Sequence, residues 1–271
     1  MNDGKTYIVT GANGGIGKAI VEGLVTRGAG RVILACRNLA KARNVITSID
    51  RRSTTLEVME LNLESFDSVR RFASEIREKG MRVDVLFNNA GTMPGDMRLT
   101  ADGYESATQT NFVSTALLTL LLLPAINDGG AIVFTTSMTR RIARLCTDWK
   151  EHAVTHHHRF TTYGRSKLML THFALDLSKE LAPHGIRVNC SDPGIVDSGI
   201  ITMGNRVIDY LCDRLFRPVI STPAEGAAPA LKAMEADVTG YIFTTKSDFP
   251  IPESYGNDPL HGIVSNFIRS L

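Results

Sequence analysis

A glycine-rich turn between two apolar segments is the feature that most constrains how this chain folds. Residues 6–10 form a short, mostly β-branched run that predicts a buried strand, and residues 16–27 carry apolar side chains at helical spacing. Gly11 and Gly15 lie between them, and Gly17 lies at the start of the helical segment. A strand that enters a helix through such a turn aims backbone N–H groups and the positive helix end at one point, which suits a phosphate. A glycine-rich loop without a ligand is the alternative.

The rest of the chain alternates between strand and helix patterns. Strands are predicted near residues 6–10, 31–36, 55–61, 83–87, 131–136, 186–191 and 239–243, and helices near 16–27, 38–49, 66–79, 104–126, 162–182 and 223–236. This alternation predicts an α/β fold of Rossmann type, a doubly wound, seven-stranded, mostly parallel sheet with helices on both faces. No linker or repeat divides the chain, so residues 1–271 are expected to form a single domain. Two long connections, about 138–160 and 194–222, are predicted at the ligand-binding edge of the sheet, the second as the substrate loop.

The composition argues against several classes of protein. Apolar residues make up 43% of the chain and the formal net charge is +2, which gives no reason to expect nucleic acid or an anionic membrane as a partner. The four cysteines form no C-x-x-C pair, so neither a zinc site nor a disulfide framework is indicated. The apolar run at 116–126 is about half the length of a membrane span. The first strand begins near residue 5, which leaves no room for a signal peptide, and we expect a cytoplasmic protein.

Arg37 is the residue that bears on the choice of cofactor. It ends the second predicted strand, 20 residues beyond Gly17. A fold that binds NAD carries Asp or Glu at this place for the adenosine 2′-hydroxyl, whereas an arginine fits a 2′-phosphate. Lys41 and Arg43 add positive charge nearby. A solvated basic helix start is the alternative, but the register with the glycine turn favours NADP(H) over NAD.

Four motifs occur in the order found in one known family. They are T-G-x-x-x-G-I-G at 10–17, N-N-A-G at 88–91, Ser137 after the fifth predicted strand, and Y-x-x-S-K at 163–167. The chain resembles the short-chain dehydrogenase/reductase family, in its compact single-domain form, over about residues 5–243. A-C-R-N at 35–38 and the long interval between Ser137 and Tyr163 make it most similar to the retinol-dehydrogenase-like reductases.

The resemblance assigns roles in catalysis to four residues. It implies that Tyr163 is the general acid/base, that Lys167 lowers the pKa of Tyr163 and holds the nicotinamide ribose, and that Ser137 hydrogen-bonds the substrate oxygen. The residues themselves support the pair, because Tyr and Lys four positions apart share one helix face and a nearby ammonium favours the phenolate. Asn111 matches the family's asparagine that holds a water of the proton relay. A polar residue that merely fits the packing is the alternative for Asn111.

Several segments are expected to line the NADP(H) site. The resemblance implies that N-N-A-G lines the cofactor, that Asn62 stands where the family usually has Asp at the adenine, and that Ser198 replaces Thr in the segment that binds the carboxamide. A structural turn is an adequate account of N-N-A-G by itself. The full expected set is Gly11, Asn13, Gly14, Gly15, Ile16, Gly17, Arg37, Asn38, Asn62, Leu63, Asn88, Asn89, Ala90, Gly91, Tyr163, Lys167, Pro193, Gly194, Val196 and Ser198.

Six of the histidines lie between residues 152 and 184. No H-x-x-x-H with a carboxylate partner is evident, so a polar, solvent-exposed loop is favoured over a metal site, and no metal is expected. The apolar side chains that follow residue 200 predict either a helix packed on the core or an apolar lid over the substrate.

The sequence thus predicts an NADP(H)-dependent oxidoreductase that transfers hydride between the nicotinamide and an apolar carbonyl or alcohol, such as a ketone, an aldehyde, or a steroid- or retinoid-like molecule. The alternative is a non-catalytic NADP-binding sensor or scaffold protein with the same fold, against which the intact Ser137, Tyr163 and Lys167 argue. Members of the family usually pair through the helices that correspond to 104–126 and 162–182. A homodimer or homotetramer is therefore expected.

Overall fold

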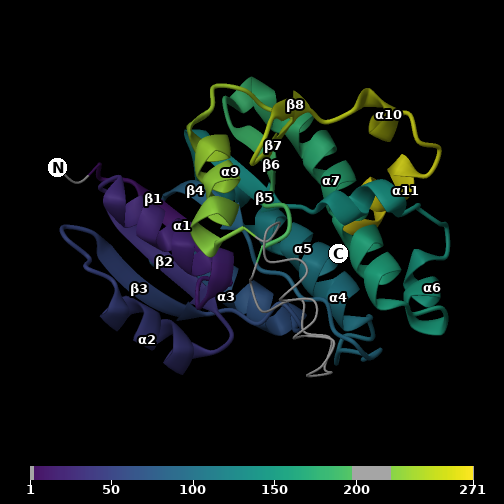
Figure 1. Cartoon of the computed structure of the whole chain (residues 1–271), viewed down its shortest axis with the longest axis horizontal. Helices are drawn as coiled ribbons and strands as arrows, with labels where there is room; N and C mark the ends of the chain where they lie inside the picture. Colours follow the sequence, from purple (N-terminus) through teal and green to yellow (C-terminus); the bar gives the residue numbers. More distant parts are fainter. Residues whose placement is uncertain (1–2, 197–220, 271) are drawn as a thin grey trace.

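One sheet runs through the whole molecule (Figure 1). The computed structural model describes residues 3–196 and 221–270. Its eight strands lie in the order β3-β2-β1-β4-β5-β6-β7-β8, and every neighbouring pair is parallel except β7 and β8. Their bounds are β1 Thr6–Thr10, β2 Arg31–Cys36, β3 Thr55–Glu60, β4 Val83–Asn88, β5 Ile126–Thr135, β6 Arg187–Asp192, β7 Tyr241–Thr244 and β8 Asp248–Pro250. The chain reverses direction across the sheet between β1 and β4, where such folds bind nucleotides.

Helices cover both faces of the sheet (Figure 1). One face carries α1 (Gly15–Thr26), α2 (Leu39–Ser48) and α9 (Pro223–Glu235), and the other carries α3 (Phe66–Glu78), α5 (Ser114–Leu122) and α7 (Arg159–Leu181). The central strands β1, β2, β4 and β6 are buried on both faces, as their continuous apolar runs predict. The predicted Rossmann-type fold is confirmed.

The predicted helix ends are confirmed by their caps. Gly28, Gly80 and Gly185 each adopt a left-handed backbone directly after a helix, where other residues are strained. Thr222 and Glu225 form the reciprocal capping box at the start of α9.

The predicted helix at 104–126 is interrupted. It begins as α4 (Ser106–Thr108), passes through a π-helical turn at Gln109–Val113 and continues as α5. Together with a 3₁₀ turn at Leu123–Ala125, this segment is long and apolar enough to cross a membrane by length and composition, yet 78% of it is buried inside the protein. It therefore packs as a core helix does. A π turn inserts an extra residue into a helix, and such turns occur often at functional sites.

The C-terminal segment adds elements that the sequence patterns did not reveal. β8 pairs antiparallel with β7, so the sheet has eight strands instead of the predicted seven. α10 (Glu253–Gly256) and α11 (His261–Arg269) then return to cover α7. The predicted pairing of subunits through 162–182 stays a prediction, and the part of α7 beneath α11 is already occupied.

The first long connection is folded. A 3₁₀ turn at Met138–Ile142 and a helix, α6 (Trp149–Thr155), lie between β5 and α7. Trp149 anchors α6 against the rings of Tyr104 and Phe267, which joins this insertion to α11. The second connection lies mostly outside the described residues.

Candidate active site

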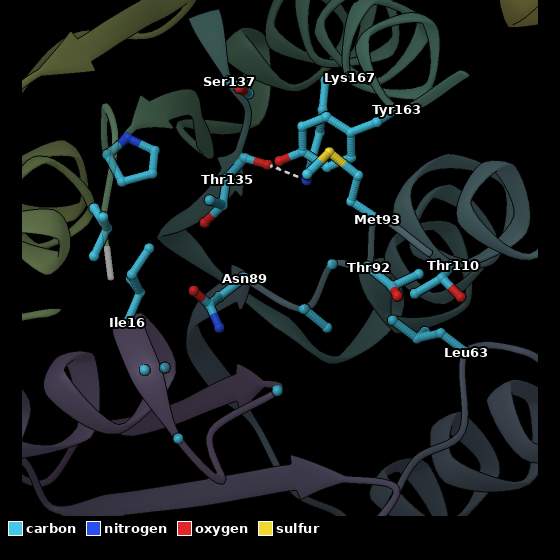
Figure 2. Close-up of a pocket in the computed structure, with 18 of the residues that line it drawn as sticks. Ile16, Leu63, Asn89, Thr92, Met93, Thr110, Thr135, Ser137, Tyr163 and Lys167 are labelled. Carbon is cyan, nitrogen blue, oxygen red and sulfur yellow. Dashed lines mark hydrogen bonds between the residues drawn. The ribbon is translucent and has the colours of Figure 1, made fainter. Parts of the chain in front are cut away.

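A cavity of about 550 Å³ opens at the carboxyl ends of the parallel strands. Its walls come from the glycine turn, from the ends of β2, β4, β5 and β6, and from the start of α7. Figure 2 shows Ile16 and Asn89 on one side of this cavity and Ser137, Tyr163 and Lys167 on the other. The cavity thus joins a predicted phosphate site to a predicted proton-transfer site.

The glycine turn packs too closely to accept side chains at two positions. A Cβ atom on Gly17 would lie 2.3 Å from the carbonyl oxygen of Gly11 and 2.7 Å from Nδ2 of Asn89. Gly11 has a φ of 65°, and a Cβ atom on it would lie 3.0 Å from the Cα of Ala90. The turn can therefore bring the first N–H groups of α1 to a ligand, and a dinucleotide pyrophosphate fits this cradle.

The segment after β4 is held by Thr10, whose Oγ1 accepts hydrogen bonds from the N–H groups of Asn89 (3.0 Å) and Ala90 (2.9 Å). The side chain of Asn89 donates to the carbonyl of Thr10 at 2.9 Å and lines the cavity. Asn88 does not line it, contrary to the prediction. Its side chain is buried and donates to Thr119 on α5 at 3.0 Å, because consecutive residues at a strand end point to opposite faces.

Two cations border the cavity beyond β2. Arg37 forms a salt bridge with Glu64 (2.9 Å), and Glu64 also pairs with Arg98. Lys41 lies over the glycine turn, since its Nζ would be 3.3 Å from a Cβ placed on Gly14. Arg37 and Lys41 thus present positive charge at the adenosine end of the cavity, where a carboxylate would favour NAD.

Tyr163, Lys167 and Ser137 meet at the other end of the cavity (Figure 2). Nζ of Lys167 lies 5.8 Å from the centre of the Tyr163 ring and donates a 2.7 Å hydrogen bond to the carbonyl of Thr135. Gly91 leaves room for this ammonium, because a Cβ there would lie 3.3 Å from it. The side chain of Ser137 hydrogen-bonds to Tyr163. The three side chains that the resemblance assigns to catalysis are therefore in one place.

Burial controls the acidity of both ionisable groups. Removal from water raises the pKa of Tyr163 to about 12, while its hydrogen bond with Ser137 acts in the opposite direction. Burial also lowers the pKa of Lys167 to about 8, partly offset by Cys190 and Asp192. Without cofactor, then, Tyr163 is a protonated phenol. Such a group donates a proton to a substrate oxygen, and it acts as a base only when added positive charge stabilises the phenolate.

Asn111 sits in the π turn of the interrupted helix and is fully buried. Its Oδ1 accepts from the N–H of Thr92 at 2.8 Å, and its Nδ2 donates to the carbonyl of Thr92 (2.9 Å) and to Oγ of Ser166 (3.0 Å). Asn111 does not line the cavity. In this structure it fixes the segment that follows Gly91 against α7, and the water relay stays a prediction.

Most of the predicted cofactor residues do line the cavity. Asn88 is the one exception among the described residues. Ser198 lies outside the described residues. The lining set is Gly11, Asn13, Gly14, Gly15, Ile16, Gly17, Arg37, Asn38, Asn62, Leu63, Asn89, Ala90, Gly91, Tyr163, Lys167, Pro193, Gly194 and Val196.

The sequence patterns missed the wall beside Tyr163. Met93, Met138 and Phe160 supply its apolar side chains, and Thr92 supplies a polar one. Each follows or precedes a recognised motif by a few positions, so proximity to the motifs was the one available signal. Among the described residues, no group of three or more His, Cys, Asp or Glu side chains is arranged to hold a metal ion.

Comparison with known proteins agrees with this geometry. The family model described as short chain dehydrogenase matches residues 5–206. The chain belongs to this family. Retinol dehydrogenase 13 from Homo sapiens is 33% identical over 268 residues, which cover 93% of this chain and 80% of the relative. Within the family, the chain is therefore retinol-dehydrogenase-like, and it is an oxidoreductase of the alcohol/carbonyl type that uses a nicotinamide cofactor.

Solved structures support the same fold. An uncharacterized protein from Mycobacterium Paratuberculosis superposes with a TM-score of 0.76 at 28% identity, covering 97% of this chain and 90% of that one. A short chain dehydrogenase from Burkholderia cenocepacia, crystallised in complex with NADP, has a TM-score of 0.71 at 23% identity and covers 89% and 96% of the two chains. At this identity, the second likeness concerns the fold alone.

Proposed function

We propose that this short-chain dehydrogenase uses NADP(H) rather than NAD(H) and acts on an apolar alcohol or carbonyl compound, of the retinoid, steroid or hydrophobic ketone and aldehyde type. The observation behind the cofactor proposal is the pair of cations, Arg37 and Lys41, that border the cavity beyond β2. A guanidinium offers a phosphate two parallel hydrogen bonds, and an ammonium adds a point charge. An adenosine 2′-hydroxyl gains little from either.

The substrate proposal comes from the wall beside Tyr163. Met93, Met138 and Phe160 give this part of the cavity an apolar surface, and methionine side chains adapt to ligands of different shape. The name of the human relative, a retinol dehydrogenase, points to the same chemical class. Burying one such side chain against a ligand contributes about 1.5–3 kcal/mol, so an apolar substrate gains affinity that a sugar or charged metabolite does not.

In the proposed mechanism, side chains of this protein donate a proton and a hydrogen bond to the substrate oxygen. The nicotinamide supplies or accepts hydride when bound. In reduction, the phenol of Tyr163 gives its proton to the substrate oxygen, and Oγ of Ser137 donates a hydrogen bond to the same oxygen. Lys167, held by the carbonyl of Thr135, keeps positive charge beside the phenol. In oxidation the same groups act in reverse.

Cofactor choice is tested by titrating NADPH and NADH against the wild type, Arg37→Ala and Lys41→Ala. A hydrogen bond to a charged group contributes about 1.5–3 kcal/mol, so Arg37→Ala is expected to weaken NADPH roughly 10- to 150-fold and to leave NADH nearly unchanged. Lys41→Ala acts in the same direction, by about 3- to 10-fold, since a flexible ammonium holds phosphate without fixed geometry.

Arg43→Ala is the matched control, because Arg43 is an exposed cation on the same helix that does not line the cavity. Its NADPH affinity is expected to stay within about twofold of wild type. A wild type that binds NADH as tightly as NADPH would overturn the cofactor proposal. A panel of ketones, aldehydes, retinoids, steroids and sugars, followed by NADPH absorbance, tests the substrate class. Sugars or charged metabolites as the best substrates would overturn that part.

A further inference from the structure

A buried ion pair lies between the two loops that end at the reaction site. Arg140 is in the 3₁₀ turn that directly follows Ser137, and Asp192 is the last residue of β6. Their side chains are 1% and 7% exposed, and Nη1 of Arg140 lies 2.6 Å from Oδ2 of Asp192. Since β5 and β6 are parallel neighbours, with Thr135 opposite Ser191, both loops leave the sheet at the same edge. The pair is separated by 52 positions in sequence.

Each partner also holds the backbone of a loop that lines the cavity. Nη1 of Arg140 donates to the carbonyl of Ser137 at 2.7 Å. Oδ1 of Asp192 accepts from the N–H of Gly194 at 3.2 Å. A continuous chain of contacts therefore runs from the catalytic serine, through the two charges, to the Pro193–Gly194 turn on the far side of the cavity.

Stability alone does not account for this pair. Taking two charges out of water costs about as much as their attraction returns, and well-packed apolar residues commonly replace such pairs without loss. In the described part of the chain, Nε of Arg140 is buried and has no hydrogen-bond partner, so the guanidinium is not fully satisfied. The free-energy cost of burying these charges is explained if they position or polarise the groups of the neighbouring reaction site.

That site responds to Asp192. Ser137 from the end of β5 and Asp192 from the end of β6 both act on the Tyr163 phenol, and Nζ of Lys167, one turn along α7, lies 5.8 Å from the centre of its ring. The Asp192 carboxylate raises the pKa of Tyr163 and also that of Lys167. Arg140, in contact with this carboxylate, balances its charge; burial raises the pKa of the neighbouring Cys190 thiol, and Arg140 acts in the opposite direction.

We propose that Arg140 and Asp192 are a positioning pair for the reaction, which fixes Ser137 against the Pro193–Gly194 turn and keeps the charge beside the Tyr163 phenol balanced. Neither residue needs to touch the substrate. The proposal rests on the oxidoreductase activity of the family and is independent of whether NADP(H) or NAD(H) is preferred.

The test compares the pH dependence of kcat for reduction in Asp192→Asn, Arg140→Met and the double variant. Reduction needs protonated Tyr163, so kcat falls as pH rises through the pKa of that residue in the complex. Asp192→Asn leaves the positive charge of Arg140 without a partner. We expect this change to move the high-pH fall of kcat, the pH limb, to lower pH by about 0.5–1 unit. Arg140→Met leaves Asp192 unbalanced and moves it to higher pH. The double variant removes both charges and returns the limb close to wild type.

Two further variants separate positioning from folding. Arg140→Lys keeps the charge but cannot hold Ser137 and Asp192 with one planar group, so kcat is expected to fall about 10-fold with the pH limb in place. Arg187→Met is the matched control: Arg187 lies at the other end of β6 and donates to the carbonyls of Met234 and Ala236. It is expected to lower thermal stability without moving the limb.

The proposal is overturned if Asp192→Asn and Arg140→Met both keep the wild-type pH dependence of kcat, or if both shift it in the same direction. If either single variant fails to fold, the double variant still tests the positioning role. Loss of the link between the two loops is expected to lower kcat, whereas a pair that serves stability alone would leave kcat unchanged. Dissociation constants for NADPH and NADH, measured on the same proteins, identify a failure of the cofactor proposal separately, since the Arg37 end of the cavity is untouched.

Discussion

At the adenosine end of the cavity, the cationic side chains lie in water, whereas at the reaction end they are buried. The side chain of Arg37 is 65% exposed and Lys41 is on the surface. Lys167 and Arg140 are each only 2% exposed. Exposed charges are screened and contribute little individually, so they suit selection among ligands. Buried charges interact strongly, so they suit control of proton affinity.

Substitutions at the two ends are therefore expected to change different measured properties. At the adenosine end, we expect substitutions to change affinity by modest factors, with rates preserved once the cofactor is bound. At the reaction end, we expect changes in rate, in pH dependence and in stability. Variants at each end test this division.

The largest expected effect is that of Tyr163→Phe. In the proposed mechanism the phenol is the proton donor, and a general acid typically contributes about 10²- to 10⁴-fold in rate. We expect kcat to fall by that factor while the NADPH dissociation constant changes less than about threefold, because the glycine turn and the cations supply that affinity.

Tyr241→Phe is the control for this change, since Tyr241 is a half-buried tyrosine of β7 that does not line the cavity. Steady-state kinetics and fluorescence titration provide the two readouts. Near-normal kcat in Tyr163→Phe would remove the residue from the mechanism, and an equal loss of cofactor binding would break the division between the two ends.

The second prediction concerns stability on the reaction side. His172, fully buried on α7, contacts His261 of α11 through their Nδ1 atoms at 2.7 Å, and His261 in turn contacts Asp176. Within the described residues, Nε2 of His172 has no hydrogen-bond partner. Burial and the neighbouring His261 lower the pKa of His172 to about 4. The folded protein therefore holds this imidazole neutral.

Because the unfolded chain binds a proton near pH 6.5 and the folded one near pH 4, unfolding takes up a proton between these values. The stabilising contribution is complete above about pH 6.5 and is lost as the pH falls towards 4. We expect the free energy of unfolding to drop by about 2 kcal/mol more between pH 7 and pH 5 in the wild type than in His172→Leu. Urea titrations at both pH values measure this, with His184→Gln, an exposed histidine, as the control. An identical slope in His172→Leu would assign the dependence to other groups.

The third prediction addresses the cofactor side. A Cβ on Gly17 would lie 2.3 Å from a backbone oxygen, so Gly17→Ala must displace the turn or the Asn89 amide. Overpacking of this kind costs about 1–3 kcal/mol, which we expect as a roughly 5- to 150-fold loss of affinity for NADPH and NADH alike. Gly95→Ala is the matched control, because the added methyl group meets nothing within 4 Å and Gly95 does not line the cavity. Equal effects of the two substitutions would show that the close approach at Gly17 is not what forms the cradle.

The sequence predicts these two regions unequally. The glycine turn and the Y-x-x-S-K face are local patterns, and most strands and helices follow from periodicity, so these appear close to where the sequence predicts them, whereas β8, α10 and α11 were not predicted. Asn88 was assigned to the wrong side because N-N-A-G says nothing about which asparagine faces the ligand. The π turn around Asn111 escapes a periodicity argument, since one inserted residue does not disturb the apolar run.

Contacts between distant segments were beyond the reach of local patterns. Arg140 and Asp192 lie in separate loops, and nothing in either loop indicates the other. The same holds for α11, whose docking on α7 through Asp176 and His261 depends on the path of the whole C-terminal segment. The reaction side is assembled largely from such contacts, which is why less of it could be predicted.

The smallest expected effect is that of Glu64→Gln, which sharpens the comparison at its exposed end. Glu64 forms salt bridges with both Arg37 and Arg98 and lines the cavity, so its carboxylate competes with a cofactor phosphate for the Arg37 guanidinium. Exposed ion pairs contribute about 0.2–1 kcal/mol, and we therefore expect NADPH to bind roughly 2- to 5-fold more tightly to Glu64→Gln, with NADH unchanged. The gain should shrink as salt is added, because the charges involved are screened. Glu60→Gln, an exposed carboxylate of β3 that does not line the cavity, is the control. Weaker NADPH binding in Glu64→Gln would show instead that Glu64 orients Arg37 for the phosphate, and the adenosine end would then depend on a fixed arrangement of charges, as the reaction end does.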